Sequence, residues 1–299
     1  MNYYDNIKDY LIRNEINHRV KDYSKNKSDL ETYYNVGKLI VEAQGGEKRA
    51  KYGDGLIKEY SQKLTNELGK KYSSRYLELM RKFYLFQKTK PLVSELSWSH
   101  YIILLSLKDD DEINYYIDTC IKYNLSKRKL LEKIKNKEYQ RLDFNTKEKL
   151  KNNKKLSLIE TIKEPIIISN PNNIEVYKEK VLHDLILDDW QHFLKELGDG
   201  YALVDSEYQI KVGDRYYYID LLLYNIEYNS YVVVELKIGE LKVEHIGQVL
   251  FYINSIDETI KKETDNKTIG IILVHKNNKL ILKYSSDSRI TAKEYIVSN

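Results

Sequence analysis

The stretch YYYIDLLLY at residues 216–224, followed by YVVVELK at residues 231–237, decides the fold of the carboxy-terminal half of the chain. Both runs are short and rich in aromatic, branched and other apolar residues, which is typical of strands buried in a sheet. Each run carries one carboxylate, Asp220 in the first and Glu235 in the second. A buried carboxylate is costly unless it is paired or coordinated, so each needs an explanation beyond packing.

Further helices and strands surround these two strands. A turn at residues 212–215 predicts that the first strand is the second arm of a hairpin. The sequence pattern predicts helices over residues 173–197 and 243–261, and strands over residues 201–210, 269–274 and 280–284. This order of elements is typical of a central mixed sheet flanked by helices on two faces.

The first half of the chain has a different periodicity. Its apolar residues recur at spacings of three and four, with few β-branched runs, so we expect an all-helical domain over residues 1–142. Residues 143–172 are rich in Lys and Asn and predict a linker, in which the apolar run 166–168 is available to dock on a neighbour. The remaining residues, 173–299, form the predicted α/β domain. The expected fold class is therefore α+β.

Composition limits the class of protein. The 299 residues, 42% of them hydrophobic, suffice for two domains. The single cysteine, Cys120, excludes an internal disulfide and a zinc site of several thiolates, which fits a reducing compartment. No basic leader and no apolar run of about 18 residues is present, so we expect a cytoplasmic protein that does not enter a membrane. Most of the 28 tyrosines should line core edges, and a few are candidates to stack on bases.

Charge is distributed unevenly along the chain. Residues 1–150 carry 30 Lys and Arg against 22 Asp and Glu, a net charge of +8, whereas residues 151–299 carry 19 against 23, a net charge of −4. The basic half is the candidate surface for nucleic acid. Its candidate contacts are Lys127, Arg128 and Lys129 at a helix start, and Lys48 and Arg49 in a glycine-bounded loop. The alternative is that these lysine-rich helices only present solvated faces.

The two carboxylates define the candidate chemistry. Alternation along a strand places Glu235 and Lys237 on the same side, and Asp220 approaches them if the two strands are neighbours. The two carboxylates then suit a hard divalent ion such as Mg²⁺, which polarises a phosphate and activates water, while Lys237 orients that water or offsets charge. The alternative is a structural salt bridge between Glu235 and Lys237 at the end of a sheet.

Several stretches of the chain carry a family resemblance. They are ELGDGYA at residues 196–202, YIDLLLY at 218–224, VELKIG at 234–239 with Gln248 and Tyr252 downstream, and, in the helical half, Val36-Gly37-Lys38 and WSHY at 98–101. In order and spacing, the first three resemble the PD-(D/E)XK nuclease superfamily, whose signature is an acidic residue in one strand and Glu-X-Lys in the next. More closely, the chain resembles the YhcG-type family, also called DUF1016, over nearly its whole length.

The resemblance implies roles for particular residues. It implies that Asp220 and Glu235 hold a metal ion, that Lys237 is the catalytic lysine and that Gln248 reaches the site from the following helix. Where the family usually has a Glu on the first helix, this chain has His183, which some branches of the superfamily use as a third ligand.

Neutral imidazole suits Mn²⁺ better than Mg²⁺. If His183 is not a ligand, Glu179 lies one helical turn earlier and is the alternative.

The sequence therefore predicts a Mg²⁺- or Mn²⁺-dependent deoxyribonuclease. The basic helical domain is expected to position double-stranded or branched DNA, and the resemblance suggests a setting in foreign-DNA defence or DNA processing. Two alternatives remain open. The nuclease fold is catalytically weak or inactive because of His183, or the helical half is chiefly an interaction domain that forms a homodimer through its tyrosine-rich faces.

Overall fold

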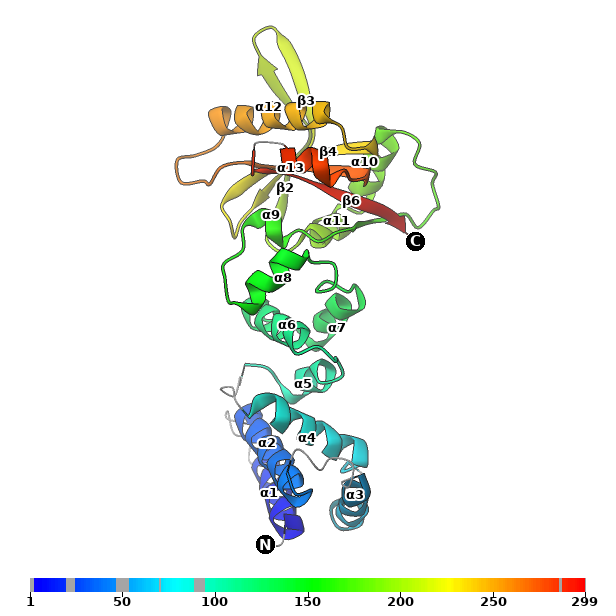
Figure 1. Cartoon of the computed structure of the whole chain (residues 1–299), viewed down its shortest axis with the longest axis vertical. Coiled ribbons are helices and arrows are strands. Elements are labelled where there is room, and N and C mark those ends of the chain that lie inside the picture. Colours follow the sequence, from blue (N-terminus) through cyan, green and yellow to red (C-terminus); the bar gives the residue numbers. More distant parts are fainter. Residues whose placement is uncertain are drawn as a thin grey trace. The chain divides into compact units, whose positions relative to one another are not determined.

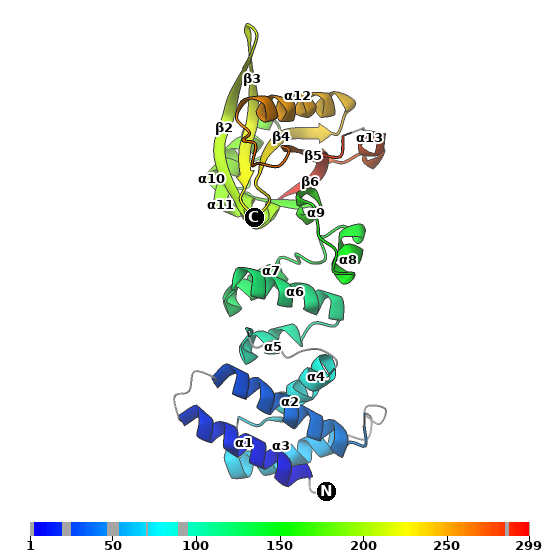
Figure 2. The ribbon, with the colours of Figure 1, turned by 90° about the vertical axis from the view of Figure 1, so that its left-hand side faces the viewer.

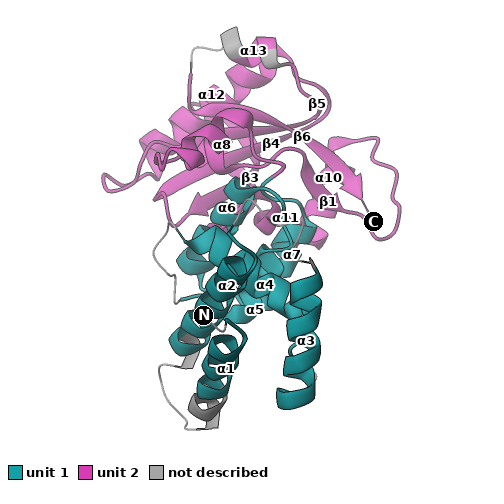
Figure 3. Cartoon of the chain, turned by 60° about the horizontal axis from the view of Figure 1, so that its bottom comes forward, with its two compact units in different colours: residues 1–139 teal, residues 140–299 magenta. Residues whose placement is uncertain are grey.

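The computed structural model describes residues 3–19, 25–46, 54–69, 71–88, 95–284 and 287–298. The chain forms two compact units, Met1–Tyr139 and Gln140–Asn299, which are coloured separately in Figure 3. In the described residues the first unit is helical and the second combines helices with a six-stranded sheet, so the predicted α+β fold class is confirmed. Of the helices in these ranges, none is long and apolar enough to cross a membrane.

The first unit is built from helices that largely follow the predicted apolar spacing (Figure 1). Their bounds are α1 (Tyr3–Arg19), α2 (Lys25–Ala43), α3 (Asp54–Leu68), α4 (Ser74–Gln87), α5 (Trp98–Leu104), α6 (Asp110–Tyr123) and α7 (Lys127–Lys135). The side chains of Ser73 and Ser126 accept backbone hydrogen bonds at the starts of α4 and α7, as expected of N-caps. Asn124 ends α6 in the left-handed conformation.

An aromatic cluster forms the core around Trp98. The Trp98 ring lies 4.6 Å from the Tyr33 ring and 5.4 Å from the Phe83 ring, measured between centroids. His100 stands beside this cluster with both ring nitrogens within hydrogen-bond distance of a partner: Nδ1 of Ser97 Oγ at 2.8 Å and Nε2 of the Leu125 carbonyl at 3.0 Å. Trp98 and His100 therefore contribute to the stability of this unit.

Helices α2 and α4 approach closely at Gly37. A Cβ atom at this position would lie 2.1 Å from the Met80 carbonyl oxygen and 2.9 Å from Tyr84 Cβ. Backbone atoms cannot yield as a flexible side chain can, so a larger residue must push the helices apart.

We expect Gly37→Ala to destabilise the first unit by about 1–3 kcal/mol, the usual cost of overpacking a core. Trp98 is buried in this unit, and the only other tryptophan is Trp190. Urea unfolding followed by Trp98 fluorescence in a Trp190→Phe background therefore measures the effect. Gly55→Ala in α3 is the matched control, because a Cβ there meets nothing within 4 Å. Equal stability of the two variants would contradict close helix packing at Gly37.

The second unit contains the sheet. Its helices are α8 (Phe144–Lys151), α9 (Leu158–Thr161), α10 (Glu179–Asp188), α11 (Trp190–Leu197), α12 (Val243–Thr259) and α13 (Lys279–Tyr284). Its strands are β1 (Ile166–Ser169), β2 (Tyr201–Val212), β3 (Arg215–Asn225), β4 (Ser230–Glu240), β5 (Ile269–Lys276) and β6 (Ile290–Ser298). They are ordered β1-β6-β5-β4-β3-β2, antiparallel from β2 to β4 and parallel from β4 to β1.

Helices cover both faces of this sheet, as the sequence predicts (Figures 1 and 2). Helices α10 and α11 pack on one face, together with Leu221, Val234 and Leu236. Helix α12 packs on the other face, together with Leu222 and Val233. Successive residues from Leu221 to Leu223 in β3 and from Val232 to Val234 in β4 therefore enter opposite cores, which explains why these stretches are continuous apolar runs.

Residues 143–172 differ from the predicted linker. They contain α8, α9 and β1, and they lie within the second unit. Ile166 and Ile168 are buried because β1 pairs in parallel with the end of β6. A four-residue edge strand between Lys- and Asn-rich segments gives too short an apolar pattern to be distinguished from a loop.

Two other predicted elements were wrong in type or extent. Residues 280–284 belong to the helix α13, before which the Asn278 side chain accepts from Leu280 N at 3.2 Å, and the last strand is β6 instead. A short apolar run is ambiguous between helix and strand. The single helix predicted over residues 173–197 is α10 and α11, separated by Asp189, whose side chain caps α11.

Candidate active site

Asp220 lies where β3 and β4 separate. The antiparallel pairing of these strands extends from Asn225 opposite Ser230 to Leu221 opposite Val234. Beyond this pair a side chain replaces the backbone as hydrogen-bond acceptor: Asp220 Oδ2 accepts from Leu236 N at 2.7 Å. The diverging strands therefore hold the Asp220 carboxylate against the backbone between Glu235 and Lys237.

Glu235 is the centre of the side-chain network. Its Oε1 accepts from Lys237 Nζ at 2.8 Å and from Gln248 Nε2 at 2.7 Å. Gln248 Nε2 also lies 3.0 Å from the hydroxyl of Tyr252, one turn further along α12. Asp220, Glu235, Lys237 and Gln248, which the sequence selected, are thus brought together by β3, β4 and α12.

The close approach of α12 to the sheet places Gln248. Gly270 in β5 faces the residue after Gln248, and a Cβ at Gly270 would lie 2.2 Å from Val249 Cγ1. Since Gly270 has no side chain, α12 can close onto β5 and bring Gln248 to Glu235. This backbone requirement explains a glycine inside an otherwise apolar strand.

The carboxylates and the lysine perturb one another. Burial, followed by the neighbouring Asp220 carboxylate, raises the pKa of Glu235 above its ordinary range, although Lys237 opposes this shift. Burial also raises the pKa of Asp220, against the Leu236 N–H and the Lys237 ammonium. Burial alone would lower the pKa of Lys237, but the hydrogen bond and charge of Glu235 outweigh it and raise that pKa. Two carboxylates and one ammonium therefore share a poorly solvated site.

The comparisons with known proteins place this site in a family. Residues 159–299 match the family model described as the YhcG PDDEXK nuclease domain, and residues 12–141 match the model described as the DUF1016 N-terminal domain. The chain belongs to the YhcG-type family of PD-(D/E)XK nucleases. The predicted resemblance is therefore confirmed over both units, and nucleases of this superfamily typically use divalent metal ions.

Relatives of this YhcG-type chain include one curated protein and distant solved structures. The curated protein, "Putative nuclease YhcG" from Escherichia coli (strain K12), is 26% identical over 81% of this chain and 75% of its own length. A repair endonuclease from Pyrococcus abyssi is 18% identical, over 42% of this chain and 49% of that chain, with a TM-score of 0.29. A complex titled EndoMS-dsDNA2 is 16% identical, over 44% and 48%, with a TM-score of 0.29. About half of each solved chain is matched.

The chemistry of this YhcG-type site fits a divalent ion in part. Among the buried side-chain atoms that the structure describes, Glu235 Oε2 has no hydrogen-bond partner, and Glu235 is 2% exposed. Glu235 also lies near the Asp220 carboxylate, which repels it. A bound cation would give Glu235 Oε2 a partner and reduce the repulsion between the two carboxylates. Oxygen donors of this kind are those that Mg²⁺ and Mn²⁺ prefer.

The predicted third ligand, His183, is not assembled with the carboxylates. Its Nε2 lies 3.2 Å from the backbone oxygen of Asp220, and its Nδ1 lies 4.0 Å from Asp184 Oδ1. Within the described ranges no group of three or more His, Cys, Asp and Glu residues is arranged to hold a metal. Glu179, the alternative, has Oε2 3.4 Å from Lys237 Nζ. A ligand role for His183 stays a prediction.

His245 is a candidate active-site residue that the sequence analysis did not identify. It precedes Gln248 by three residues on α12 and follows Glu244, whose side chain is largely exposed. The Nδ1 atom of His245 accepts from Lys242 N at 3.2 Å, so the neutral ring carries its proton on Nε2. Burial and then the Lys237 ammonium lower the pKa of His245. The sequence signal that could have identified His245 is its spacing of three residues before Gln248, which places both side chains on one face of a helix.

The predicted nucleic-acid contacts lie in the first unit. Lys127, Arg128 and Lys129 form the exposed first turn of α7. Lys48 and Arg49 lie outside the described residues. Contact of any of these side chains with nucleic acid stays a prediction.

Proposed function

We propose that this YhcG-type nuclease hydrolyses phosphodiester bonds within DNA, with Mg²⁺ or Mn²⁺ held by Asp220 and Glu235. The observation that carries the proposal is the buried Glu235 carboxylate, one oxygen of which is fixed by Lys237 and Gln248 while the other has no described partner. Such an arrangement is unfavourable as a structural feature and suits a cation-binding site.

A bound divalent ion would supply a Lewis acid that polarises the scissile phosphate and lowers the pKa of a bound water. Lys237 contributes a fixed positive charge, because Glu235 raises the pKa of its ammonium and its side chain is 13% exposed. It can therefore offset charge that develops on the phosphate, or orient the attacking water. Gln248 holds Glu235 in one orientation, and His245 Nε2–H is a neutral donor one helical turn away.

The first unit is assigned to DNA positioning. The excess of Lys and Arg in residues 1–150 and the exposed start of α7 support this role. Phosphate contacts release counterions, so DNA affinity should fall steeply as salt rises from 50 to 200 mM. A unit that served mainly as a homodimer interface would show little dependence on salt.

One observation favours a catalytically weak nuclease fold as the second candidate. The described residues supply two carboxylates but no assembled third ligand, and His183 Nε2 faces a backbone carbonyl instead. A site with fewer ligands binds its ion less tightly. The YhcG-type domain would then serve chiefly to bind DNA.

A cleavage assay separates the two candidates. The full chain is incubated with end-labelled linear and circular DNA in Mg²⁺, in Mn²⁺ and in EDTA. The proposal expects cleavage with either metal, including nicking or linearisation of the circle, and none in EDTA. DNA binding without cleavage in any metal would favour the second candidate, and cleavage that persists in EDTA would contradict metal dependence.

A further inference from the structure

The outer half of the β2–β3 hairpin extends beyond the helices that cover the sheet (Figures 1 and 2). Its strands remain paired to the turn, with Gln209 opposite Tyr218 and Lys211 opposite Tyr216. These four residues are called the hairpin face below. Two large rings on this face are unusually open, since Tyr216 is 53% and Tyr218 is 54% exposed.

Both rings of the hairpin face are braced from the facing strand. Gln209 Nε2 donates to the Tyr218 hydroxyl at 2.9 Å, and Lys211 Nζ lies 5.7 Å from the centre of the Tyr216 ring. Cross-strand contacts of this kind limit the rotamers of an exposed ring. The rings are thus positioned before any partner arrives, which lowers the entropic cost of binding.

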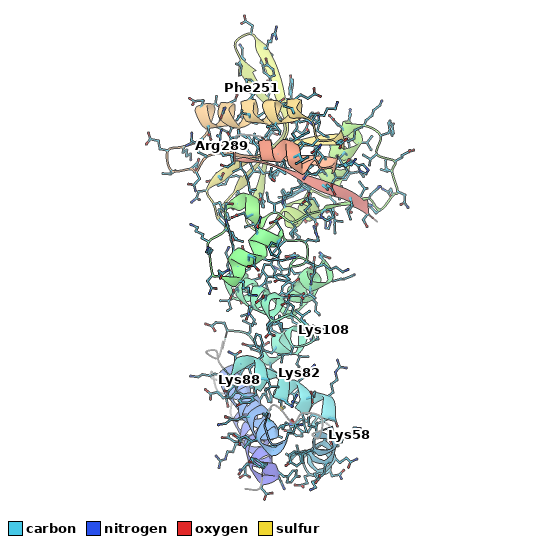
Figure 4. All side chains as sticks on the ribbon, in the orientation of Figure 1. Lys58, Lys82, Lys88, Lys108, Phe251 and Arg289 are labelled. Carbon is cyan, nitrogen blue, oxygen red and sulfur yellow. The ribbon has the colours of Figure 1, made fainter. Side chains whose placement is uncertain are left out.

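The opposite side of the hairpin anchors it to the body of the domain. The Tyr217 ring contacts the ring of Phe251, which is labelled on α12 in Figure 4, with 4.9 Å between centroids. Ile210 and Ile219 are buried against the same helix. The hairpin is therefore held by apolar packing on one side, and the hairpin face lies on the other, exposed side.

Strand β3 connects the hairpin face to the candidate active site. Tyr216, Tyr218 and Asp220 follow one another at intervals of two residues in β3. At about 3.4 Å per residue, Tyr218 and Tyr216 stand about 7 and 14 Å from Asp220 along the strand. A nucleic-acid strand whose phosphate lies at Asp220 would extend its neighbouring nucleotides along β3 toward the two rings.

We infer that the hairpin face binds unpaired bases of the DNA strand beside the phosphodiester that is cleaved. The inference rests on the proposed function and names its substrate class: DNA with unpaired nucleotides next to the cleavage point, such as a flap. Bases stack on aromatic rings only when their faces are free of a duplex, and a nearby cation such as Lys211 neutralises the connecting phosphate. A blunt duplex offers no such free faces.

Binding measured without catalysis tests the inference. Fluorescence anisotropy in EDTA compares the full chain on a duplex with a single-stranded flap and on a blunt duplex of equal length. The wild type should bind the flap substrate more tightly, and Tyr218→Ala should weaken that binding about tenfold while changing blunt-duplex binding little. Tyr218→Phe, which keeps the ring, should retain the preference, and Tyr216→Ala should repeat the loss.

Phe144→Ala is the matched control, because Phe144 is 73% exposed in the same unit but lies on α8 and away from β3. Equal affinities of wild type and both Tyr→Ala variants for the flap would overturn the inference, as would equal losses on both substrates. A change from dimer to monomer in the Tyr→Ala variants would overturn it in favour of a second copy of the chain. Failure of cleavage in every metal would contradict the proposed function but leave this binding result readable.

Discussion

The Lys237→Met variant should cleave DNA about 10²- to 10³-fold more slowly than the wild type, the usual effect of removing one preorganised group that stabilises transition-state charge. Methionine has a similar length and no charge, so the change removes the ammonium while filling its space. The side chain is nearly buried, with Nζ 2.8 Å from Glu235 Oε1 and 3.4 Å from Glu179 Oε2. The initial rate of substrate loss, measured at saturating Mn²⁺, gives the effect.

Lys276→Met is the matched control for Lys237→Met. Lys276 is 71% exposed and pairs at the surface with Glu240, so the Lys276→Met variant should cleave DNA as fast as the wild type. If the two variants cleave equally fast, Lys237 has no role in the reaction. If both bind the DNA as the wild type does but only Lys237→Met is slow, the lysine acts in the chemical step.

Arg141→Met should destabilise the second unit by about 3–5 kcal/mol, because it leaves a buried carboxylate without its cation. Arg141 Nη2 forms an ion pair with Glu196 Oε2 and donates to the Pro165 carbonyl at 2.7 Å. The same Glu196 oxygen accepts from Ile167 N, at the start of β1, at 3.1 Å. The ion pair therefore attaches the edge strand β1 to α11.

Hydrogen exchange of the full chain can locate the effect of Arg141→Met. Peptides that span β1 and α11 should exchange faster, while peptides of α4 in the first unit serve as an internal control. Arg141→Met combined with Glu196→Leu should recover much of the loss, because the buried charge is removed together with its partner. A single variant that exchanges like the wild type would contradict the assigned role of this pair.

The contribution of the Arg141–Glu196 ion pair to stability should decrease at acid pH. Burial alone would raise the pKa of Glu196, but Arg141, then Lys163, outweigh it and lower that pKa below its ordinary value. A carboxyl with a lowered folded-state pKa contributes stability above its unfolded pKa, and this contribution is lost as the pH falls through the folded value. The wild type should therefore lose more stability in acid than the double variant does.

The parts of the fold that the sequence predicted best are those with strong local signals. The runs in β3 and β4 are almost wholly apolar and each contains one carboxylate, so both the strands and the site residues stood out. Leu221 and Leu222 enter different cores, as an apolar run buried on two faces requires. The helix start expected at Lys127 is the start of α7, which Ser126 caps.

The parts that were missed depend on contacts distant in the sequence. Strand β1 exists because Ile166 and Ile168 pair with β6 more than a hundred residues later, which no local pattern contains. The short apolar run at residues 280–284 is compatible with strand or helix, and it belongs to the helix α13, which Asn278 caps. The orientation of His183 likewise depends on the backbone of β3, to which its ring lies close.

Mn²⁺ binding in the absence of DNA tests the central claim most directly. Titration of the full chain, with free Mn²⁺ counted by electron paramagnetic resonance, should show saturable binding to the wild type that is largely lost in both Asp220→Asn and Glu235→Gln. Glu244→Gln, which alters an exposed carboxylate on α12, should bind as the wild type does. Equal binding by all four proteins, or no binding by the wild type, would contradict a metal site formed by Asp220 and Glu235.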